Sequence, residues 1–329
     1  MKAIQAARPG GPSVLRLCEL DTPEPGQGQL LVQVQAAGVN FIDTYRRSGV
    51  YAGKFPHVPG SEGAGLVQRV GPGATSAVGE RVMWVESVTG SYAEYAIVDQ
   101  TAAVPVPEYF DLTVAASVAL QGMTADYLVQ NTFPVGPGHT VAFYAAAGGV
   151  GQLATQMILA KGARLIAVVG SATKTEKVAA LGVPPEDIIV LGAMSDVGRQ
   201  LPTKLRALTD GAGVDVVYDS IGADTFMASL ASVKPRGMVV LFGGSSGQVQ
   251  PFDPQELNAH GSIYLTRPKL GDYTATHQEL TIRANRVLRA VGEGRLAVSP
   301  SLVLPLDQAA EAHRDLESRS TTGKIVLTP

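Results

Sequence analysis

The chain begins with short apolar or alternating segments separated by turns rich in proline and glycine. From residue 1 to about 123, runs such as LLVQVQAAGV and YAEYAIV lie between turns such as TPEPGQGQ and VGPGATSAVGE. Alternation between such turns is typical of strands, so this zone is predicted to be mostly antiparallel β-structure. Short helices are expected at Asp43–Arg47 and Leu112–Leu120, the second with Asp111 as its N-terminal cap.

From about residue 124 to 265 the pattern changes to β-branched runs separated by periodic segments of helix length. Runs that are apolar throughout and are joined by crossover helices indicate a parallel sheet that helices cover on both faces. We therefore predict a doubly wound α/β domain here. The expected strands are Thr140–Tyr144, Leu165–Val169, Asp187–Val190, Val214–Tyr218, Met238–Phe242 and Ser262–Leu265, and the expected helices are Val150–Lys161, Lys174–Leu181, Val197–Leu208 and Thr225–Val233.

After about residue 270 the pattern predicts two amphipathic helices and a closing strand. The helices are expected at Gln278–Val291 and Asp307–Ser318, with the segment SLVLPL between them, and the strand at Lys324–Leu327. A lone strand needs partners, and the N-terminal β zone is the nearest candidate. The first and last zones are thus expected to form one domain that the α/β zone interrupts.

The composition is that of a folded protein with a sizeable core. Of the 329 residues, 45% are hydrophobic and 17% are charged, and this length favours two domains. The net charge of −3 supplies no basic field for a phosphate backbone, so nucleic acid is not expected as the main partner. Cys18 is the only cysteine, which excludes an intramolecular disulfide and fits a reducing cytoplasm.

Neither export nor membrane insertion is expected. The N-terminus, MKAIQAARPGGPSVL, lacks the continuous apolar core of a signal peptide. The stretch Val141–Ala160 is long enough to imitate a membrane span, but Gly148, Gly149 and Gly151 interrupt it. These glycines favour a buried strand, a tight turn and a core-packed helix.

The strongest chemical signal is the segment YAAAGGVG at Tyr144–Gly151, between a predicted strand and a predicted helix. The strict G-x-G-x-x-G pattern is absent. Small residues nevertheless stand wherever the backbone must turn sharply, approach a pyrophosphate or let the helix pack on the strand. The free N–H groups of the helix N-terminus would face the phosphates, so Ala147, Gly148, Gly149 and Val150 are predicted to bind a dinucleotide.

The residues after the second strand of this domain favour NADPH over NADH. NAD sites place a carboxylate there to hold the ribose 2′-hydroxyl, whereas this chain has Gly170-Ser171-Ala172-Thr173-Lys174. No acid repels a 2′-phosphate, and Ser171 and Lys174 can donate hydrogen bonds to it. The alternative is that Ser171 or Thr173 only caps a helix while Lys174 is solvated.

Taken together, several motifs resemble the quinone oxidoreductases of the zinc-free medium-chain dehydrogenase/reductase superfamily, the group that includes ζ-crystallin. The resemblance covers essentially the whole chain. It implies a Rossmann domain at 124–265 inserted in a GroES-like substrate domain made of 1–123 and 266–329, with a homodimer as the usual assembly. The motifs are NFIDTY at Asn40–Tyr45, Ser48–Tyr51, Gly60–Gly65, Tyr144–Gly151, YDSIG at Tyr218–Gly222, TRP at Thr266–Pro268 and LESR at Leu316–Arg319.

Zinc-dependent relatives carry a catalytic Cys in the segment that here reads GVNFID and a His in the segment that here reads PGSEGAG. At those places this sequence has Asn40 and Ser61, neither of which supplies the thiolate or imidazole that zinc needs. The five histidines are scattered without a pair at metal-ligand spacing. No metal site is therefore expected, and reduction of an electron-poor acceptor is favoured over oxidation of an alcohol.

The resemblance also implies the site residues. Hydride would pass from the nicotinamide to a quinone or similar conjugated carbonyl, with the protein supplying orientation and exclusion of water. The residues implied around the acceptor are Asn40, Tyr45, Tyr51, Gln121 and Thr124, and each tyrosine is alternatively a half-buried core ring. The residues implied along the cofactor, besides the loop and Gly170, Ser171 and Lys174, are Phe41, Ile42, Asp43, Thr124, Ser220, Phe242, Gly243, Gly244, Ser245, Thr266, Arg267, Pro268 and Arg319.

Two alternatives and one departure remain at this point. The same scaffold serves NADPH-dependent reductases of enones, alkenals and enoyl thioesters, and some relatives bind RNA or act as structural crystallins. Relatives often place an aromatic residue after the third strand to cover the adenosine phosphate, but this chain has Val190-Leu191-Gly192 there. The preference for NADPH is accordingly expected to be weaker than Lys174 alone indicates.

Overall fold

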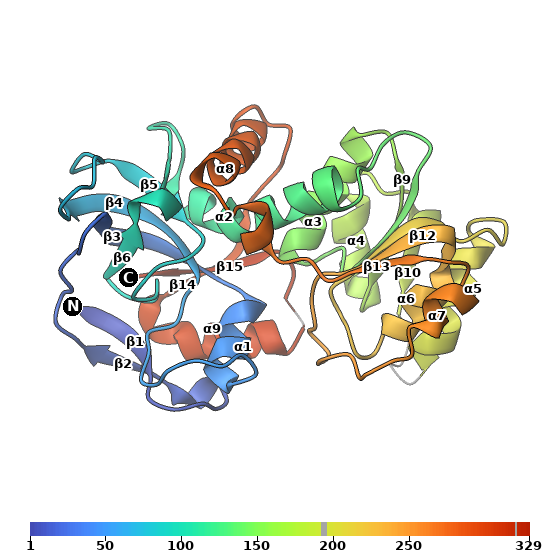
Figure 1. Ribbon diagram of the computed structural model, residues 1–329, viewed down its shortest axis with the longest axis horizontal. Coiled ribbons are helices and arrows are strands. Elements are labelled where there is room, and N and C mark those ends of the chain that lie inside the picture. Colours follow the sequence, from blue (N-terminus) through green and yellow to red (C-terminus); the bar gives the residue numbers. More distant parts are fainter. Residues whose placement is uncertain (192–195, 320) are drawn as a thin grey trace. The chain divides into compact units, whose positions relative to one another are not determined.

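The computed structural model describes residues 1–191, 196–319 and 321–329. The chain forms two compact units, one made of Met1–Met123 with Thr274–Pro329 and the other of Thr124–Tyr273. The two ends of the chain, blue and red in Figure 1, thus belong to the same unit. Gly192, which the sequence interpretation included, lies outside the described residues.

The first unit is built on a mostly antiparallel sheet. In the part of the chain that the structure describes, the sheet order is β14-β15-β3-β4-β5-β7, and β6 also pairs with β3. The closing strand lies antiparallel to β3, with Ile325 opposite Val39 and Leu327 opposite Ala37, which confirms the predicted pairing of the first and last zones. These strands are β3 (Gln29–Val39), β4 (Glu62–Val70), β5 (Arg81–Trp84), β6 (Tyr95–Asp99), β7 (Val104–Pro105), β14 (Pro300–Pro305) and β15 (Lys324–Thr328), and β1 (Lys2–Ala6) pairs with β2 (Leu15–Glu19).

Helices pack around this sheet because their apolar faces complete its core. The core cluster joins residues far apart in the sequence, among them Val32, Trp84, Tyr92, Ala312 and Ile325. Asp111 accepts hydrogen bonds from the N–H groups of Thr113 and Val114, as predicted for a cap. The helices are α1 (Phe41–Ser48), α2 (Leu112–Tyr127, which ends in the second unit), α8 (His277–Gly292) and α9 (Ala309–Glu317).

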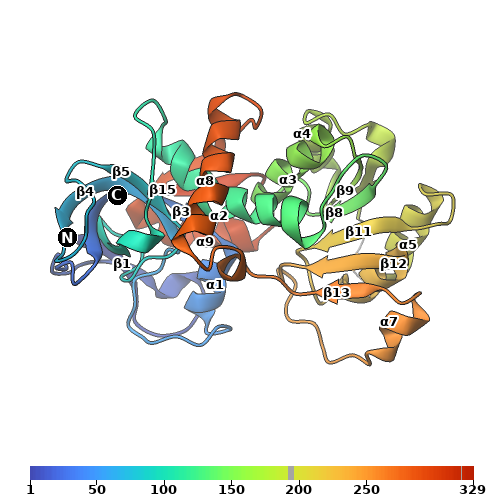
Figure 2. The same cartoon turned by 45° about the horizontal axis from the view of Figure 1, so that its top comes forward.

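The second unit is the predicted doubly wound domain. Within the described ranges it holds a six-stranded parallel sheet in the order β10-β9-β8-β11-β12-β13, of which β11, β12 and β13 are seen side by side in Figure 2. Strand residues are buried on both faces, as apolar runs without alternation require. The strands are β8 (Thr140–Tyr144), β9 (Arg164–Val169), β10 (Ile188–Val190), β11 (Val214–Asp219), β12 (Val233–Leu241) and β13 (Tyr264–Thr266), and the helices are α3 (Gly149–Ala160), α4 (Thr175–Ala179), α5 (Val197–Ala207), α6 (Phe226–Ser232) and α7 (Gln255–Ala259).

Three features differ from the sequence prediction. The second unit extends past the predicted boundary at residue 265 to Tyr273, whose ring stacks on Tyr127 of the same unit with centroids 4.4 Å apart. The helix expected at Leu112–Leu120 runs on to Tyr127, since its sequence is apolar on all sides and carries no signal for an end. The short helix α7 was not predicted.

One helix of the described residues, Leu112–Thr132, is long and apolar enough to pass as a membrane span by length and composition. Of its most apolar window, 72% is buried in the fold, as in the core helix of a soluble protein. The stretch Val141–Ala160 instead forms β8, a turn and α3, as predicted.

Candidate functional site

The predicted cofactor residues of the second unit gather at one edge of its sheet. Because the strands are parallel, the loops that follow β8, β9, β11, β12 and β13 all leave from the same edge. The chain order reverses between β8 and β11, which lie next to each other. Open α/β sheets bind their ligands outside the carboxyl ends of the strands at such a reversal.

The loop after β8 is shaped for close approach of a phosphate group. Ala145 adopts a left-handed backbone conformation with φ 55°, and the N–H of Gly148 donates to its carbonyl oxygen at 2.8 Å. A Cβ at Gly151 would lie 2.4 Å from that same carbonyl oxygen, so only glycine fits there. The first N–H groups of α3 lack partners inside the helix and face the loop. This cradle of small residues fits a dinucleotide.

A buried carboxylate organises the loop after β11. Asp219 accepts hydrogen bonds from the N–H groups of Ile221 and Gly222 at 2.8 and 3.0 Å and from the hydroxyls of Thr225 and Ser229. Burial raises its pKa, while these hydrogen bonds act in the opposite direction. Asp219 therefore fixes the backbone at Ser220, a residue predicted to contact the cofactor.

The loop after β12 packs directly on the loop after β11. The N–H of Phe242 donates to the carbonyl oxygen of Asp219 at 2.8 Å, and that of Ser245 donates to Ser220 O at 3.2 Å. A Cβ at Gly243 would lie 2.6 Å from Ser220 O, which explains the glycine. The structure thus brings Ser220 and residues 242–245 together, as the cofactor prediction requires.

The residues after β9 form a tight polar turn. The hydroxyls of Ser171 and Thr173 lie 2.9 Å apart. Lys174 is half-buried, and its burial lowers the pKa of the ammonium group. Gly170 has no atom within 4 Å of the place where a Cβ would stand, so its surroundings leave room for a ligand.

The remaining predicted residues are distributed between the units. Thr266 ends β13, and the Arg267 side chain lies 3.5 Å from Pro268 O. Thr124 is buried in α2 at the start of the second unit, whereas Gln121 and Arg319 belong to the first. Arg319 has a left-handed backbone with φ 58°, just after α9.

In the first unit, two rings of α1 and that of Tyr51, which follows the helix, form an aromatic cluster. The rings of Tyr45 and Tyr51 meet edge to face with centroids 5.4 Å apart, and Phe41 lies 6.2 Å from Tyr45. Tyr51 keeps 38% of its surface exposed. Tyr45 is half-buried, so the alternative of a half-buried core ring stays open for it, whereas Tyr51 is more exposed.

Asn40, just before α1, is held by a buried ion pair that the sequence analysis did not single out. Its Nδ2 donates to Glu62 Oε1 at 2.6 Å, and its Oδ1 accepts from Lys324 Nζ at 2.8 Å. Lys324 and Glu62 also pair with each other, with side chains only 4% and 0% exposed. Gln121 Nε2 donates to the same Asn40 oxygen at 3.2 Å. Asn40 and Gln121, predicted separately, thus share one hydrogen-bond network.

Asp43 is buried beneath α1 and turns its carboxylate inward. Oδ1 accepts from the N–H and hydroxyl of Ser61 at 2.9 and 2.7 Å, and Oδ2 accepts from the N–H of Asn40 at 3.0 Å. Burial, partly offset by these hydrogen bonds and by Lys324, raises the pKa of Asp43 to about 6. The carboxylate therefore positions α1 against Ser61, the residue directly before β4, and any cofactor contact of Asp43 would use its backbone.

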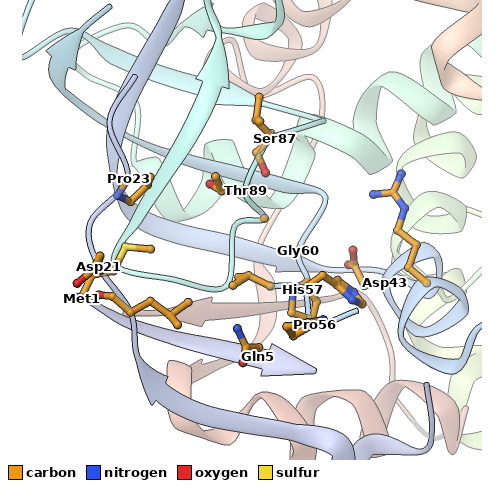
Figure 3. Close-up of a pocket in the computed structure, with 16 residues that line it drawn as sticks. Met1, Gln5, Asp21, Pro23, Asp43, Pro56, His57, Gly60, Ser87 and Thr89 are labelled. Atoms are coloured by element: carbon orange, nitrogen blue, oxygen red, sulfur yellow. Dashed lines mark hydrogen bonds between the residues drawn. The ribbon is translucent and has the colours of Figure 1, made fainter. Parts of the chain in front are cut away.

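A pocket of about 470 Å³ lies in the first unit and reaches Asp43 at one end (Figure 3). His57 lines it, and its ring packs edge-on against Phe55 with centroids 4.7 Å apart. Both ring nitrogens of His57 are buried and have no hydrogen-bond partner among the described residues. Burial lowers the pKa of His57, and the nearby Arg46 charge adds to this effect, so the imidazole is favoured in its neutral form.

Comparison with known proteins places this architecture in a family. Residues 26–108 match the alcohol dehydrogenase GroES-like domain, and residues 191–327 match a zinc-binding dehydrogenase domain. A quinone oxidoreductase of Pseudomonas aeruginosa is 38% identical over 100% of this chain and 99% of its own length. The chain belongs to the quinone oxidoreductase family of the medium-chain dehydrogenase/reductase superfamily.

Two further members are informative about ligands. The Escherichia coli quinone oxidoreductase, solved as a complex with NADPH, superimposes with a TM-score of 0.95 at 36% identity, covering 100% of both chains. A 2-haloacrylate reductase of a Burkholderia species is 37% identical over 97% of this chain and 96% of its own length. The family thus includes reductases of more than one conjugated substrate.

Asn40 and Ser61, which the resemblance implies stand where zinc-dependent relatives carry their ligands, do not fit a zinc ion. Asn40 offers an amide that Glu62 and Lys324 already engage, and the Ser61 hydroxyl donates to Asp43. Neither is a thiolate or an imidazole, and the ammonium group of Lys324 opposes a second cation beside it. Among the residues that the structure describes, no three His, Cys, Asp or Glu side chains form a group that could hold a metal.

Sequence reasoning missed Glu62, Lys324 and Asp219. A weak signal existed for the first two, because Glu62 is the single charge in the small-residue segment PGSEGAG and Lys324 precedes the apolar run IVL. Charges in apolar surroundings are buried only when paired. No sequence rule, however, pairs two residues that stand 262 positions apart.

Proposed function

We propose that this protein is a metal-independent, NADPH-dependent quinone oxidoreductase. The observation that supports the proposal is the edge of the second unit, where the loop after β8 is packed too closely for a side chain at Gly151 and Asp219 orders the loop after β11. We interpret this edge as the dinucleotide cradle. Full-length similarity to quinone oxidoreductases, one of them solved with NADPH, supports the choice of cofactor and substrate.

The chain's own residues would bind and orient the reactants. When bound, NADPH supplies a hydride from C4 of its nicotinamide ring. Residues 147–150 would hold the pyrophosphate through backbone N–H groups, and Ser171 and Lys174 would donate to the 2′-phosphate. Ser220, residues 242–245, Thr266, Arg267, Pro268 and Arg319 would complete the cofactor site, with Phe41, Ile42, Asp43 and Thr124 toward the nicotinamide.

The acceptor would rest against the aromatic cluster of α1. The hydroxyls of Tyr45 and Tyr51 would donate to its carbonyl oxygens, while the rings exclude water. A quinone accepts hydride readily, so orientation of the two reactants provides most of the catalysis. We further propose a homodimer in the cytoplasm, as the family resemblance and the single cysteine favour.

A second candidate is reduction of an activated carbon–carbon double bond. The similarity to a 2-haloacrylate reductase favours it, because an α,β-unsaturated acid is also a conjugated hydride acceptor. NADPH oxidation should be followed with 1,4-benzoquinone, 9,10-phenanthrenequinone, an alkenal, a crotonyl thioester and 2-chloroacrylate. A kcat/KM for the quinones at least ten-fold above every other substrate supports the first proposal, and the reverse order supports the second. Failure to oxidise NADPH with any substrate would refute both.

A further inference from the structure

The buried pair of Lys324 and Glu62 fixes the direction of the amide of Asn40. Lys324 has only donors, so it requires the Asn40 oxygen, which lies 2.8 Å from its amine. The ionised Glu62 has only acceptors, so it requires the Asn40 nitrogen, which lies 2.6 Å from its Oε1. With a charge on each side, the amide cannot turn around.

The orientation of Asn40 in turn fixes that of Gln121. The Asn40 oxygen faces Gln121 at 3.2 Å and needs a donor, so the Gln121 nitrogen must point toward it. The Gln121 oxygen is left on the other side of its amide. That oxygen is buried and has no hydrogen-bond partner among the residues that the structure describes. A buried acceptor without a donor costs free energy until a ligand supplies one.

Neighbouring residues hold the Lys324–Glu62 pair in place and leave room for it. Glu62 Oε2 accepts from the N–H of Leu120 at 2.6 Å, which ties the ion pair to the helix residue directly before Gln121. A Cβ at Gly38 would lie 2.2 Å from Glu62 Oε1 and 2.7 Å from Lys324 Cε, so a glycine makes room for the pair. The network thus connects β3, β4, β15 and α2.

We propose that Lys324, Glu62 and Asn40 are positioning residues that make Gln121 a hydrogen-bond acceptor for a bound ligand. The ligand group is an O–H or amide N–H donor, which both the reduced cofactor and a hydroquinone product carry. A quinone carbonyl, which only accepts, is not recognised by Gln121. The inference rests on the proposed function for the identity of these two ligands.

Gln121→Glu tests the direction of the amide. The introduced carboxylate, when ionised, cannot donate to the Asn40 oxygen, and the like charge of Glu62 on the other side of Asn40 raises its pKa. When protonated, its O–H donates to Asn40 and its carbonyl oxygen faces the ligand as the wild-type amide does. NADPH affinity, measured by fluorescence titration, and inhibition by hydroquinone should therefore recover as the pH falls from 8 to 5.5.

Gln121→Met, which has neither group, should lose about ten-fold in affinity for the recognised ligand at every pH, the size of one lost hydrogen bond. Gln68→Glu, an exposed change on β4, is the matched control and should bind like wild type. The NADPH titration and the hydroquinone inhibition together show which ligand supplies the donor, because only the ligand that Gln121 recognises should lose affinity in the Gln121 variants. If Gln121→Met binds both ligands like wild type, Gln121 contacts neither and the proposal is wrong.

Whether the ion pair positions Gln121 must be tested with variants that still fold. Lys324→Met alone leaves Glu62 buried without a partner, whereas the double variant Lys324→Met with Glu62→Gln removes both charges and should fold. It should lose about the same factor in ligand affinity as Gln121→Met, while Lys324→Arg should retain wild-type affinity. A folded double variant with wild-type affinity would show that the ion pair does not position Gln121. Absence of quinone reduction by the wild type would instead refute the proposed function, while the NADPH affinities would still be measurable by fluorescence titration.

Discussion

His313 Nδ1 lies 3.0 Å from an Nη atom of Arg47 in the core of the first unit. A guanidinium group only donates, so Nδ1 accepts and the hydrogen of the neutral imidazole sits on Nε2. That N–H donates to the Tyr92 hydroxyl at 3.1 Å, and Tyr92 in turn donates to Asp43 at 3.4 Å. Arg47 also pairs with Glu317 at 2.5 Å. The charge of Arg47 thus sets the direction of the hydrogen bonds that run from Arg47 through His313 and Tyr92 to Asp43.

Because His313 is neutral in these hydrogen bonds, we expect the folded protein to lose stability at acid pH. Burial, with the Arg47 charge as a second cause, lowers the pKa of His313 to about 3. The unfolded chain binds a proton near pH 6.5 and the folded chain does not, so stability falls as pH drops below 6.5. The contribution of His313 should amount to about 2 kcal/mol at pH 5. Urea unfolding of wild type between pH 7 and pH 5 measures the loss.

His313→Gln should remove this part of the pH dependence, because a glutamine accepts from Arg47 and donates to Tyr92 without titrating. Asp43 acts in the opposite sense, since its raised pKa favours folding on acidification, but it is present in both proteins. The difference between them therefore isolates His313. Equal slopes for both proteins would contradict the assignment. His260→Gln, in the second unit, is the control.

Lys174→Ala should weaken NADPH binding by roughly 1.5–3 kcal/mol and hardly affect NADH, because a charge-assisted hydrogen bond to the 2′-phosphate is lost. Added salt should reduce the difference. Lys177→Ala, an exposed lysine on α4, should leave both affinities unchanged. Equal losses for the two cofactors would mean that Lys174 supports the fold or the pyrophosphate site.

Gly151→Ala should destabilise the second unit by about 1–3 kcal/mol, the usual cost of forcing an atom into a packed site, and should impair NADPH binding. The added Cβ would lie 2.4 Å from Ala145 O, which the loop cannot accept without moving. Gly170→Ala, with nothing within 4 Å of its Cβ, is the control for folding. Thermal unfolding with and without NADPH checks both effects, and a fully stable Gly151→Ala with normal affinity would refute the cradle.

Tyr45→Phe and Tyr51→Phe should each lower kcat/KM for a quinone by no more than about ten-fold, or about 1.4 kcal/mol, at unchanged NADPH affinity. A quinone needs little help from a hydrogen-bond donor, and water can reach the partly exposed Tyr51. The double variant should be assayed at saturating NADPH. Wild-type turnover would show that neither hydroxyl contributes, and a loss above about a thousand-fold would identify an essential proton donor.

Activity should persist after exhaustive treatment with a chelator, because Asn40 and Ser61 supply no thiolate or imidazole and Lys324 adds positive charge beside Asn40. Elemental analysis of the active enzyme checks this. Stoichiometric zinc whose removal abolishes turnover would overturn the metal-free mechanism.

The sequence by itself determined the parts that local physics encodes. Apolar runs without alternation gave the parallel strands, and the small residues of YAAAGGVG marked a loop that must pack closely, as the 2.4 Å approach at Gly151 shows. The closing strand was predictable because an isolated strand cannot satisfy its backbone alone. The assignment of Asn40, Tyr45, Tyr51 and Gln121 to the acceptor came from family resemblance, and it stays a prediction.

The tertiary structure alone decided which polar groups meet. Lys324 and Glu62 come together across 262 residues, and Arg47 and His313 across 266. No regular spacing in the sequence marks such pairs, because long-range strand pairing and helix packing bring the two residues together. Their interaction is strong only because both residues are buried. The boundary of the second unit at Tyr273 was likewise not predictable, because it follows from tertiary contacts, among them the ring of Tyr273 stacked on Tyr127.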